Sequence, residues 1–450
     1  MSNIRAFGAQ GDGKSDDTAA LEHAIAEGDG RIRIPPGEYR ISKTIELDLA
    51  TAGPLSVEGS GGTARIVMTA PGPALRLIGN HPGTGDPTTR SDQVRLTERM
   101  PTLSNLEITG AHAEADGIEL VGTLQPVLSH LLVHGVRHGI RLHKRNRNVL
   151  IHDCHIYFNT GVGIFFDAVN LHQVNITGNH ISYNRLGGIR LERSEVRNLQ
   201  ITGNDIEYNN HAEHDTDPEP TAEIYVDTTA EGASVNEVTV CSNTIQATPS
   251  AGGANILIRD DQQQGLRPGL WTISGNMITN QENNLHLIGC RGVVISGNNI
   301  CTCKNRNILL EDCELITIGH NHFRTHTSRL GVGVKLVDSS DCILNGCQWL
   351  DDAETGQASG ASLLELQRCQ RISVSGCHFL DGVPMGIDVA DSSDISIADC
   401  LISDRRSPAL ARHLIRFSGP GSGNQLTGNR LGASAGEPLS LADESGVVVK

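Results

Sequence analysis

The sequence predicts an all-β fold, a single-stranded right-handed parallel β-helix with a short N-terminal capping α-helix. Three observations predict it. A Thr-Gly-Asn or Ser-Gly-Asn phrase returns at intervals of mostly 22 to 30 residues. Each interval also holds an apolar-x-apolar phrase that is typical of a short strand. The 50 glycines and the low aromatic content of 3% favour short strands broken by tight turns over helices.

The first 50 residues differ from the rest, and we expect them to form the N-terminal cap and the first coil. Residues 19–27 place Leu21, Ala24 and Ile25 on one face of a short helix. A solenoid must cover the open end of its core, which is the role expected for this helix. Residues 51–450 are expected to continue as one β-helix, because coils add in one dimension without requiring a second domain.

The run FGAQGDGKSDDTAALEHAI followed by IPPGEY resembles the N-terminal signature of the pectate-lyase superfamily of β-helix proteins. That superfamily includes enzymes related to glycoside hydrolase family 28 and phage tailspikes. The resemblance implies the β-helix fold and a carbohydrate ligand. It leaves the reaction open, because such scaffolds carry hydrolases, lyases, epimerases, fructotransferases and adhesins without enzymatic activity. The paired Asp residues and Gly-His-Gly of polygalacturonases are not visible here, nor is the calcium-binding Asp set of classical pectate lyases.

The Gly-Asn turns predict a ladder of stacked asparagines inside the solenoid, because Asn at a turn can bond neighbouring backbone groups. The expected column contains Asn179, Asn204, Asn243, Asn276, Asn298, Asn321 and Asn429. Cys154, Cys347, Cys377 and Cys400 take the place of Asn in other coils, and Cys290, Cys313 and Cys369 mark a second column. We therefore interpret these cysteines as small buried side chains and not as catalytic groups.

The apolar-x-apolar strands predict two columns of outward-facing side chains on one lateral face, because side chains alternate along a strand. The first column runs through Glu119, Arg141, Phe165, Arg190, Tyr225, Leu257, His286, Leu309, Lys335, Glu365, Asp388 and Arg416. The second runs through Val121, His143, Asp167, Glu192, Asp227, Arg259, Ile288, Glu311, Val337, Gln367, Ala390 and Ser418. Five successive coils of the second column, from His143 to Arg259, carry an ionisable group.

Asp167, Glu192 and Asp227 are the predicted catalytic residues. Retaining glycosidases hold two carboxyl groups about 5 to 5.5 Å apart and inverting ones about 6.5 to 9.5 Å apart. Neighbouring coils match the first separation and alternate coils the second, because strands stack at about 4.8 Å. Crowding of carboxylates would also raise one pKa and keep a general acid protonated. The alternative is that these charges pair across the ladder and only stabilise the sheet.

The predicted substrate-binding residues surround these carboxylates. On the columns they are Arg141, His143, Phe165, Arg190, Tyr225, Arg259, Asp260 and His286. Half of the chain's aromatic residues fall in the same coils, namely Tyr157, Phe158, Phe165, Phe166, Tyr183, Tyr208 and Tyr225. Sugar rings stack on such side chains, although Phe166 is expected in the core.

Two insertions interrupt the repeat, at residues 81–100 and 211–223. Loops beside a rigid scaffold often carry function, so Asp217 and Glu223 are expected to overhang the same face and contact substrate. A solvated acidic loop or a subunit contact is the alternative. The arginines of residues 81–100 are expected to wall the cleft or to meet a neighbouring subunit.

The function predicted from the sequence is cleavage of a glycosidic bond in an oligo- or polysaccharide by a glycoside hydrolase, without cofactor or metal. The alternatives are a polysaccharide lyase, an intramolecular fructo- or glycosyltransferase, and a glycan-binding adhesin. The formal net charge of -16 argues against nucleic acid or an anionic membrane as partner. A homotrimer is a further expectation. No signal peptide or long apolar stretch is visible, so the chain is expected to be cytoplasmic, or secreted with its signal removed.

Overall fold

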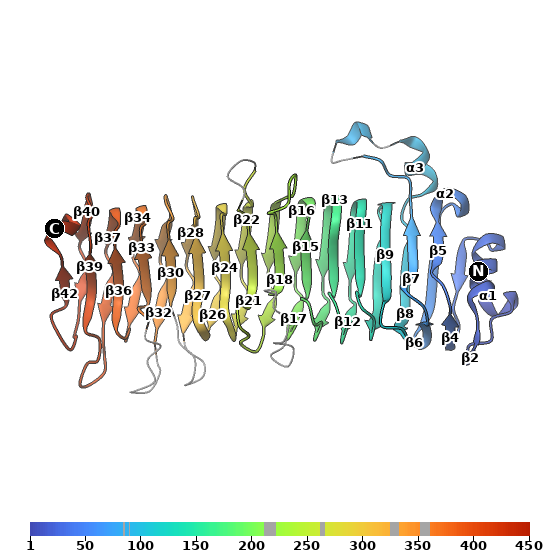
Figure 1. Ribbon diagram of the computed structural model, residues 1–450, viewed down its shortest axis with the longest axis horizontal. Helices are drawn as coiled ribbons and strands as arrows, with labels where there is room; N and C mark the ends of the chain where they lie inside the picture. The colour runs from blue at the N-terminus through green and yellow to red at the C-terminus, as the bar shows by residue number, and fades with distance from the viewer. Residues whose placement is uncertain (84–85, 90, 211–221, 262–265, 325–332, 352–360) are drawn as a thin grey trace. The chain divides into compact units, whose positions relative to one another are not determined.

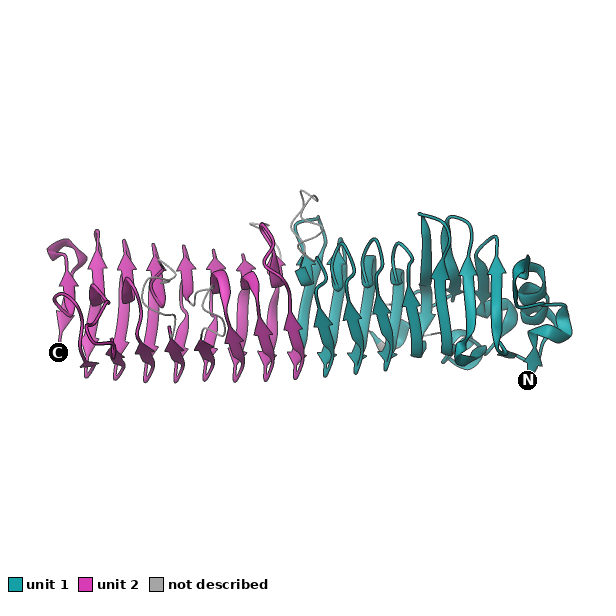
Figure 2. Cartoon of the chain, turned by 90° about the horizontal axis from the view of Figure 1, so that it is seen from below, with its two compact units in different colours: residues 1–214, 222–239 teal, residues 215–221, 240–450 magenta. Residues whose placement is uncertain are grey.

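The computed structural model describes residues 1–83, 86–89, 91–210, 222–261, 266–324, 333–351 and 361–450. The strands pair in parallel, each with the equivalent strand of the next coil, as expected for a parallel β-helix (Figure 1). Two compact units divide the chain (Figure 2). Unit 1 comprises residues 1–214 and 222–239, and unit 2 comprises residues 215–221 and 240–450.

Unit 1 begins with the cap that the sequence predicts. Helix α1 spans Thr18–Glu27 and buries Leu21 and Ala24. Short helices α2 (Leu49–Ala52) and α3 (Asp92–Thr97) follow. Residues 81–100, expected as a loop, thus contain helix α3. Its N-cap is Ser91, whose hydroxyl accepts a hydrogen bond from the Val94 amide.

Three series of strands build the coils of unit 1. One lateral face, called the site face here, consists of β5 (Ile45–Asp48), β7 (Gly72–Ile78), β9 (Ala115–Leu124), β11 (Ile140–His152), β13 (Ile164–Thr177), β15 (Ile189–Glu192) and β18 (Ala222–Asp227). The other faces contain β1 (Ser2–Asn3), β2 (Asp12–Asp16), β3 (Arg31–Arg33), β4 (Gly37–Ile41), β6 (Ser56–Met68), β8 (Thr102–Gly110), β10 (Val127–His134), β12 (His155–Tyr157), β14 (His180–Ser182), β16 (Glu195–Thr202) and β17 (Asp205–Glu207). Strand β19 (Ser234–Cys241) contains the boundary between the units.

Unit 2 repeats the same pattern. The strands that continue the apolar-x-apolar phrase are β21 (Ala254–Arg259), β24 (Gln281–Ile288), β27 (Cys303–Glu311), β30 (Val334–Val337), β33 (Leu364–Gln367), β36 (Met385–Ala390), β39 (His413–Ser418) and β42 (Leu439–Leu441). Its second series is β22 (Gly269–Ser274), β25 (Arg291–Ser296), β28 (Thr317–Gly319), β31 (Ile343–Asn345), β34 (Gln370–Ser375), β37 (Ser393–Ala398), β40 (Asn424–Thr427) and β43 (Val447–Val449). Its third is β20 (Thr244–Gln246), β23 (Met277–Thr279), β26 (Asn299–Cys301), β29 (His322–Arg324), β32 (Gln348–Leu350), β35 (His378–Leu380), β38 (Leu401–Ser403) and β41 (Arg430–Leu431).

The predicted asparagine ladder lies in the interior of each unit. In unit 2, the side-chain Oδ1 of Asn276 accepts hydrogen bonds from the backbone and side-chain amides of Asn243, and Asn298 and Asn321 continue the chain. The substituting cysteines are buried as expected, and all eleven thiols are free. Unit 1 holds a second ladder that the turn phrase did not reveal, made of Asn159, Asn184 and Asn209.

Candidate functional site

The two outward columns have the predicted register on the site face of unit 1. Arg141 pairs with Phe165, Phe165 with Arg190, and Arg190 with Tyr225. The second column follows two residues later on each strand, where His143, Asp167, Glu192 and Asp227 are paired in sequence. The alternation of each strand therefore brings the predicted catalytic carboxylates onto one face, on successive coils.

Asp167 lies between two guanidinium groups. Arg141 donates to Oδ2 of Asp167 through Nε at 3.0 Å and Nη2 at 2.5 Å, and Arg193 pairs with Oδ1. Burial by itself would raise the pKa of Asp167, but the hydrogen bonds from Arg141 and Arg193 outweigh it and lower that pKa. Asp167 is therefore ionised in the neutral range. The expected crowding effect, a raised pKa for a general acid, is not found at Asp167.

Glu192 is also held by two arginines. Arg190 donates to Oε1 of Glu192 from Nε at 2.7 Å and from Nη2 at 2.5 Å. Arg193 reaches Oε2 at 3.2 Å and so bridges Glu192 to Asp167. Arg193 is not among the predicted site residues, because it follows Glu192 and would face inward in a regular strand. Its left-handed backbone, with φ of 51°, turns the chain at this point.

Tyr225 and Asp227 form a separate contact on β18. The Tyr225 hydroxyl donates to Oδ2 of Asp227 at 3.1 Å, and Thr229 donates to Oδ1 from its amide at 2.9 Å. The guanidinium of Arg190 lies over the Tyr225 ring, 4.5 Å from the centroid. Tyr225 is only 3% exposed, so the prediction that its ring faces solvent for sugar stacking is wrong.

Phe165 is likewise covered. It is 8% exposed, and its ring packs against the imidazole of His138, with 5.1 Å between the centroids. Burial lowers the pKa of His138 to about 4, and the Val162 amide donates to its Nδ1 at 3.2 Å. His138 is thus neutral. It lies in the turn before β11 and covers the Phe165 ring of the next coil. The prediction of Phe165 as an exposed stacking platform is also wrong.

His143 stands out from the paired charges around it. Its Nδ1 lies 2.9 Å from the main-chain oxygen of Asp167. Because a carbonyl can only accept, this contact assigns the proton to Nδ1 and leaves Nε2 of a neutral ring as an acceptor. In the described part of the chain, Nε2 of His143 has no hydrogen-bond partner. The register between β11 and β13 shifts directly after His143, and such bulges occur often beside active sites.

The ion pairs of the site extend toward the N-terminal cap. Glu119 accepts from Arg141 at 2.8 Å and from Arg76 at 2.5 Å, and Arg76 reaches Glu46 at 3.2 Å. Acidic and basic side chains thus alternate along the site face, from β5 to β15, in what we call the ion ladder: Glu46, Arg76, Glu119, Arg141, Asp167, Arg193, Glu192 and Arg190. This arrangement matches the alternative interpretation of cross-strand pairing for most of the charged residues.

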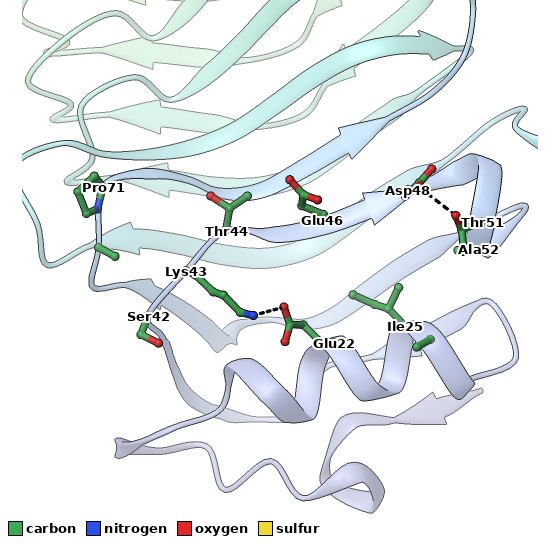
Figure 3. A pocket seen from close by; sticks show the side chains of 12 residues that line it. Glu22, Ile25, Ser42, Lys43, Thr44, Glu46, Asp48, Thr51, Ala52 and Pro71 are labelled. Carbon is green, nitrogen blue, oxygen red and sulfur yellow. Dashed lines mark hydrogen bonds and ion pairs between the residues drawn. The ribbon is translucent and has the colours of Figure 1, made fainter.

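A cavity of about 690 Å³ lies beside the first member of the ion ladder, between helix α1 and β5 (Figure 3). Glu46 lines it together with Asp48 and the ion pair of Lys43 with Glu22, whose charged atoms are 2.8 Å apart. None of the predicted site residues lines this cavity. It is a feature of the cap and not the place where the predicted carboxylates meet.

Glu223 and Asp217 do not form the expected overhang. Glu223 has no exposed surface, and its Oε2 accepts from the backbone and side-chain amides of Asn209 at 3.1 and 2.6 Å. It ends the second asparagine ladder, so its predicted contact with substrate is wrong. Asp217 lies outside the described residues.

Three predicted binding residues belong to unit 2. His286 contacts Glu311, with 2.6 Å between Nε2 and Oε2. Arg259 is half-buried at the end of β21, and Asp260, which follows it, is buried with 6% exposure. Their relation to the site face of unit 1 stays a prediction.

No metal site or membrane span is evident within the described ranges. No group of three or more His, Cys, Asp or Glu side chains is arranged there to hold a metal ion. No helix in the same part of the chain combines the length and apolar character needed to cross a membrane.

Comparison with known proteins gives short sequence matches to a mannuronan epimerase and an alginate lyase. Mannuronan C5-epimerase AlgE6 of Azotobacter vinelandii is 36% identical over 84 residues, 17% of this chain and 10% of the relative. Alginate lyase 7 of the same organism is 50% identical over 44 residues, 9% of this chain and 5% of the relative. The chain therefore matches only a small fraction of these relatives. Among solved structures, PfbA, a surface adhesin of Streptococcus pneumoniae, has a TM-score of 0.53 at 13% identity, over 83% of this chain and 92% of PfbA.

Two sequence families match the chain directly. Residues 1–52 are similar to the family described as rhamnogalacturonase A/epimerase, pectate lyase-like, which agrees with the resemblance seen in the N-terminal run. Residues 88–206 and 254–431 match the right-handed β-helix region. The second match covers more than half of the sequence and coincides with the stacked coils of both units. The chain belongs to the family of right-handed β-helix proteins related to the pectate-lyase superfamily.

Proposed function

We propose that the protein is a carbohydrate-active enzyme that removes the C5 proton of a uronate residue in a polysaccharide, with His143 as the base. The observation that carries this proposal is the hydrogen bond of His143 Nδ1 to the carbonyl of Asp167, which leaves Nε2 available to accept a proton. Two relatives with local sequence identity are named for reactions on mannuronan and alginate, which are uronate polymers.

Arg141 supports the same chemistry from the same strand. Arg141 and His143 are two residues apart on β11, so both side chains leave the outer face of the strand. A uronate carboxylate that approaches His143 would compete with Asp167 and Glu119 for the Arg141 guanidinium. Arginine binds carboxylates through paired N–H groups, and it would neutralise the charge that develops on the sugar.

The proposed reaction has two outcomes. His143 Nε2 takes the C5 proton, and the electron pair of the C–H bond moves into the sugar carboxylate. A proton from solvent water then adds to the opposite face of C5 as the electron pair returns to that carbon, and His143 releases its own proton to solvent, so that C5 is inverted. Alternatively, the electron pair forms a C4–C5 double bond while the O4 substituent leaves and takes up a proton from solvent water, which cleaves the chain as a lyase does.

The glycoside hydrolase predicted from the sequence is a second candidate. Asp167 and Glu192 lie on neighbouring coils, as a retaining pair would. However, each carboxylate is bound by two arginines, and the lowered pKa of Asp167 makes it a poor proton donor. The geometry therefore supports proton abstraction by His143 better than protonation of a leaving group by Asp167. The transferase, the adhesin and the homotrimer stay predictions.

A panel of uronate polymers, neutral oligosaccharides and fructans tests the proposal, with products read by mass and ultraviolet absorbance. The wild type is compared with His143→Gln, Asp167→Asn and Glu192→Gln. His378→Gln, at an exposed position on β35, is the matched control. We expect absorbing fragments or inverted uronate residues from the wild type and the control, and neither from His143→Gln. Products that gain water and disappear only in the carboxylate variants would favour the hydrolase instead.

A further inference from the structure

A row of aromatic rings, exposed at Phe158 and Tyr183 and half-buried at Tyr208, crosses three successive coils of unit 1. Phe158, Tyr183 and Tyr208 directly follow β12, β14 and β17, and we call these three residues the aromatic ridge. Adjacent rings are nearly parallel, with interplanar angles of 14° and 10° and centroid distances of 4.9 and 5.6 Å. These centroid distances lie within the range of about 4.5–7 Å that is typical of interacting aromatic pairs.

Part of the ring surface is open to solvent. Phe158 is 59% exposed, and Tyr183 is still 40% exposed although a ring lies on each side of it. The preceding coil has Gly135 at the equivalent position, so no side chain continues the row in that direction. Single exposed apolar residues are common on protein surfaces, but a continuous row of them marks an interaction site.

The backbone of the aromatic ridge also departs from local preference. Phe158, Tyr183 and Tyr208 have φ of 53°, 57° and 55°, in the left-handed region. That conformation costs residues with a bulky side chain about 1–2 kcal/mol and favours Gly or Asn. The turn alone therefore does not explain why three successive coils carry an aromatic ring there.

The second asparagine ladder fixes the ridge in place. Each aromatic residue is followed by a buried ladder residue: Asn159, Asn184 and Asn209. Asn159 donates to Asn184 at 2.8 Å, and Asn184 donates to Asn209 at 2.7 Å. A row of rings on such a rigid support loses little conformational freedom when it binds a ligand.

The ridge borders the site face within the same coils. Only residues 159–163 separate Phe158 from β13, which carries Phe165 and Asp167. Polar groups flank the rings, because Tyr157, Ser182 and Glu207 form the paired row directly before them. Rings with polar neighbours, one coil apart, match a polymer that presents apolar ring faces and hydroxyl groups at regular intervals.

We propose that the aromatic ridge is a second polysaccharide-binding subsite, which holds the polymer against its exposed ring surface beside the site face. The proposal rests on the proposed function for the identity of the ligand as a uronate polysaccharide. A second copy of the chain is a weaker occupant, because three rings offer much less than the roughly 800 Å² per partner of a stable protein interface.

The double variant Phe158→Asn, Tyr183→Asn tests this subsite. Asn tolerates the left-handed conformation, so the variant removes the rings without straining the turn. The matched control is Leu270→Asn, Leu315→Asn, because both leucines are exposed and have φ of 55° and 57° in unit 2. Affinity is measured by retardation in native gels that contain sodium alginate, and turnover is measured on short mannuronate oligomers.

We expect the ridge variant to bind the alginate polymer roughly tenfold more weakly, as the loss of two exposed rings implies, while the control keeps its affinity. Turnover of short oligomers, which need only the site face, should stay within about twofold of the wild type. Thermal melting checks the fold, and the single variant Tyr183→Asn provides the same comparison if the double variant melts early.

Equal retardation of the ridge variant and the wild type would overturn the subsite. So would a wild type that no alginate concentration retards, or a sedimentation shift showing that the variant dissociates a multimer. Failure of the proposed enzyme can be distinguished from failure of the subsite. A wild type that is retarded through the ridge but forms no product would support the subsite and contradict the proposed enzyme.

Discussion

At the scale of the residue, His143 and Glu223 are the two ionisable groups with the most informative surroundings. His143 is half-buried on β11, and its ring is oriented by a backbone carbonyl. Glu223 is fully buried, with one oxygen bound to Asn209 and Oε1 without a partner among the described residues. Both are predicted substrate-binding residues, but only His143 presents a reactive atom toward the outside.

The first prediction concerns the base. His143→Gln should lower turnover of a uronate polymer by about 10²-fold or more, since general acid–base groups contribute about 10²–10⁴-fold. The affinity for the polymer should change much less, because Arg141 and Arg193 are still present. Steady-state kinetics with kcat and KM separated checks this, with His378→Gln as control. Unchanged kcat in His143→Gln would exclude His143 as the base.

The second prediction concerns Glu223 and pH. Burial raises the pKa of Glu223 well above 4.5, so the folded chain keeps a proton that the unfolded chain loses. Stability is therefore full below the unfolded pKa of 4.5 and falls as pH rises toward the folded pKa. Glu223→Gln carries no charge and should be more stable at neutral pH by about 1 kcal/mol or more, since one pKa unit equals about 1.4 kcal/mol.

Melting of Glu223→Gln and wild type from pH 4 to pH 9 measures this difference, roughly the range over which a raised carboxyl pKa acts. The two melting curves should converge at the acid end and separate as pH rises. If the melting temperatures of the two proteins differ by the same amount at every pH, Glu223 is not protonated in the folded state.

At the scale of the element, the second asparagine ladder and the ion ladder of unit 1 differ in their surroundings. The second asparagine ladder is internal and uncharged, whereas the ion ladder lies on the site face and is partly exposed. Interior hydrogen bonds are costly to break because the remaining partner is left unsatisfied, while exposed ion pairs contribute little. We therefore expect a mutation in the second asparagine ladder to lower the free energy of unfolding much more than a mutation in the ion ladder.

The third prediction tests the interior ladder. Asn184 has no exposed surface, accepts from Asn159 at 2.8 Å, and donates to Asn209 and to the Ile156 carbonyl. Asn184→Ala should lower the free energy of unfolding by about 2–4 kcal/mol, because more than one buried group loses its partner. Denaturant unfolding checks it against Asn175→Ala, which alters a partly exposed position on β13. A loss no larger than that of the control would refute the structural role of the ladder.

The fourth prediction tests the ion ladder. Arg193 is about half exposed and bridges Asp167 and Glu192, so Arg193→Gln should cost less than about 1 kcal/mol of stability. Its larger effect should be on Asp167, whose lowered pKa should rise toward 3.8 when one guanidinium is removed. Carboxyl NMR titration measures that pKa, with Arg95→Gln as an exposed control.

The sign follows from linkage. Because the folded pKa of Asp167 is lowered, its stabilising contribution is present above 3.8 and is lost as pH falls through the folded pKa. The wild type should therefore lose more stability than Arg193→Gln between neutral and acid pH. An unchanged Asp167 titration in the variant would show that Arg141 alone sets the pKa.

At the scale of the whole molecule, the repeat explains what the sequence predicts well. A one-residue error in register would turn every side chain of a strand to the opposite face, so the alternation of apolar residues specifies the columns strictly. The registers from Arg141 to Tyr225 and from His143 to Asp227 are accordingly confirmed. The interior Asn and Cys positions follow from the same repeat, whereas the capping helix follows from the helical spacing of Leu21, Ala24 and Ile25.

The sequence predicts less well which side chains of one coil cover those of the next coil. Phe165 and Tyr225 occupy outward positions, but His138 and Arg190 cover their rings. Arg193 reaches the site because of a left-handed turn that alternation does not reveal. Glu223 was assigned to a loop, although the strand begins before it, at Ala222. Contacts at the turns between strands depend on backbone angles and side-chain length, which a periodic sequence pattern does not specify.

The proposed enzyme depends on removal of a proton from C5 of a uronate by His143. Exchange in deuterated water is the decisive test: an oligouronate is incubated with wild type or His143→Gln, and deuterium at C5 is read by NMR and product mass. If His143 is the base, the wild type gives deuterium at C5 of inverted residues, or an unsaturated C4–C5 end where cleavage occurs, and His143→Gln gives neither. Cleavage that adds water, leaves C5 fully protonated and persists in His143→Gln would contradict it.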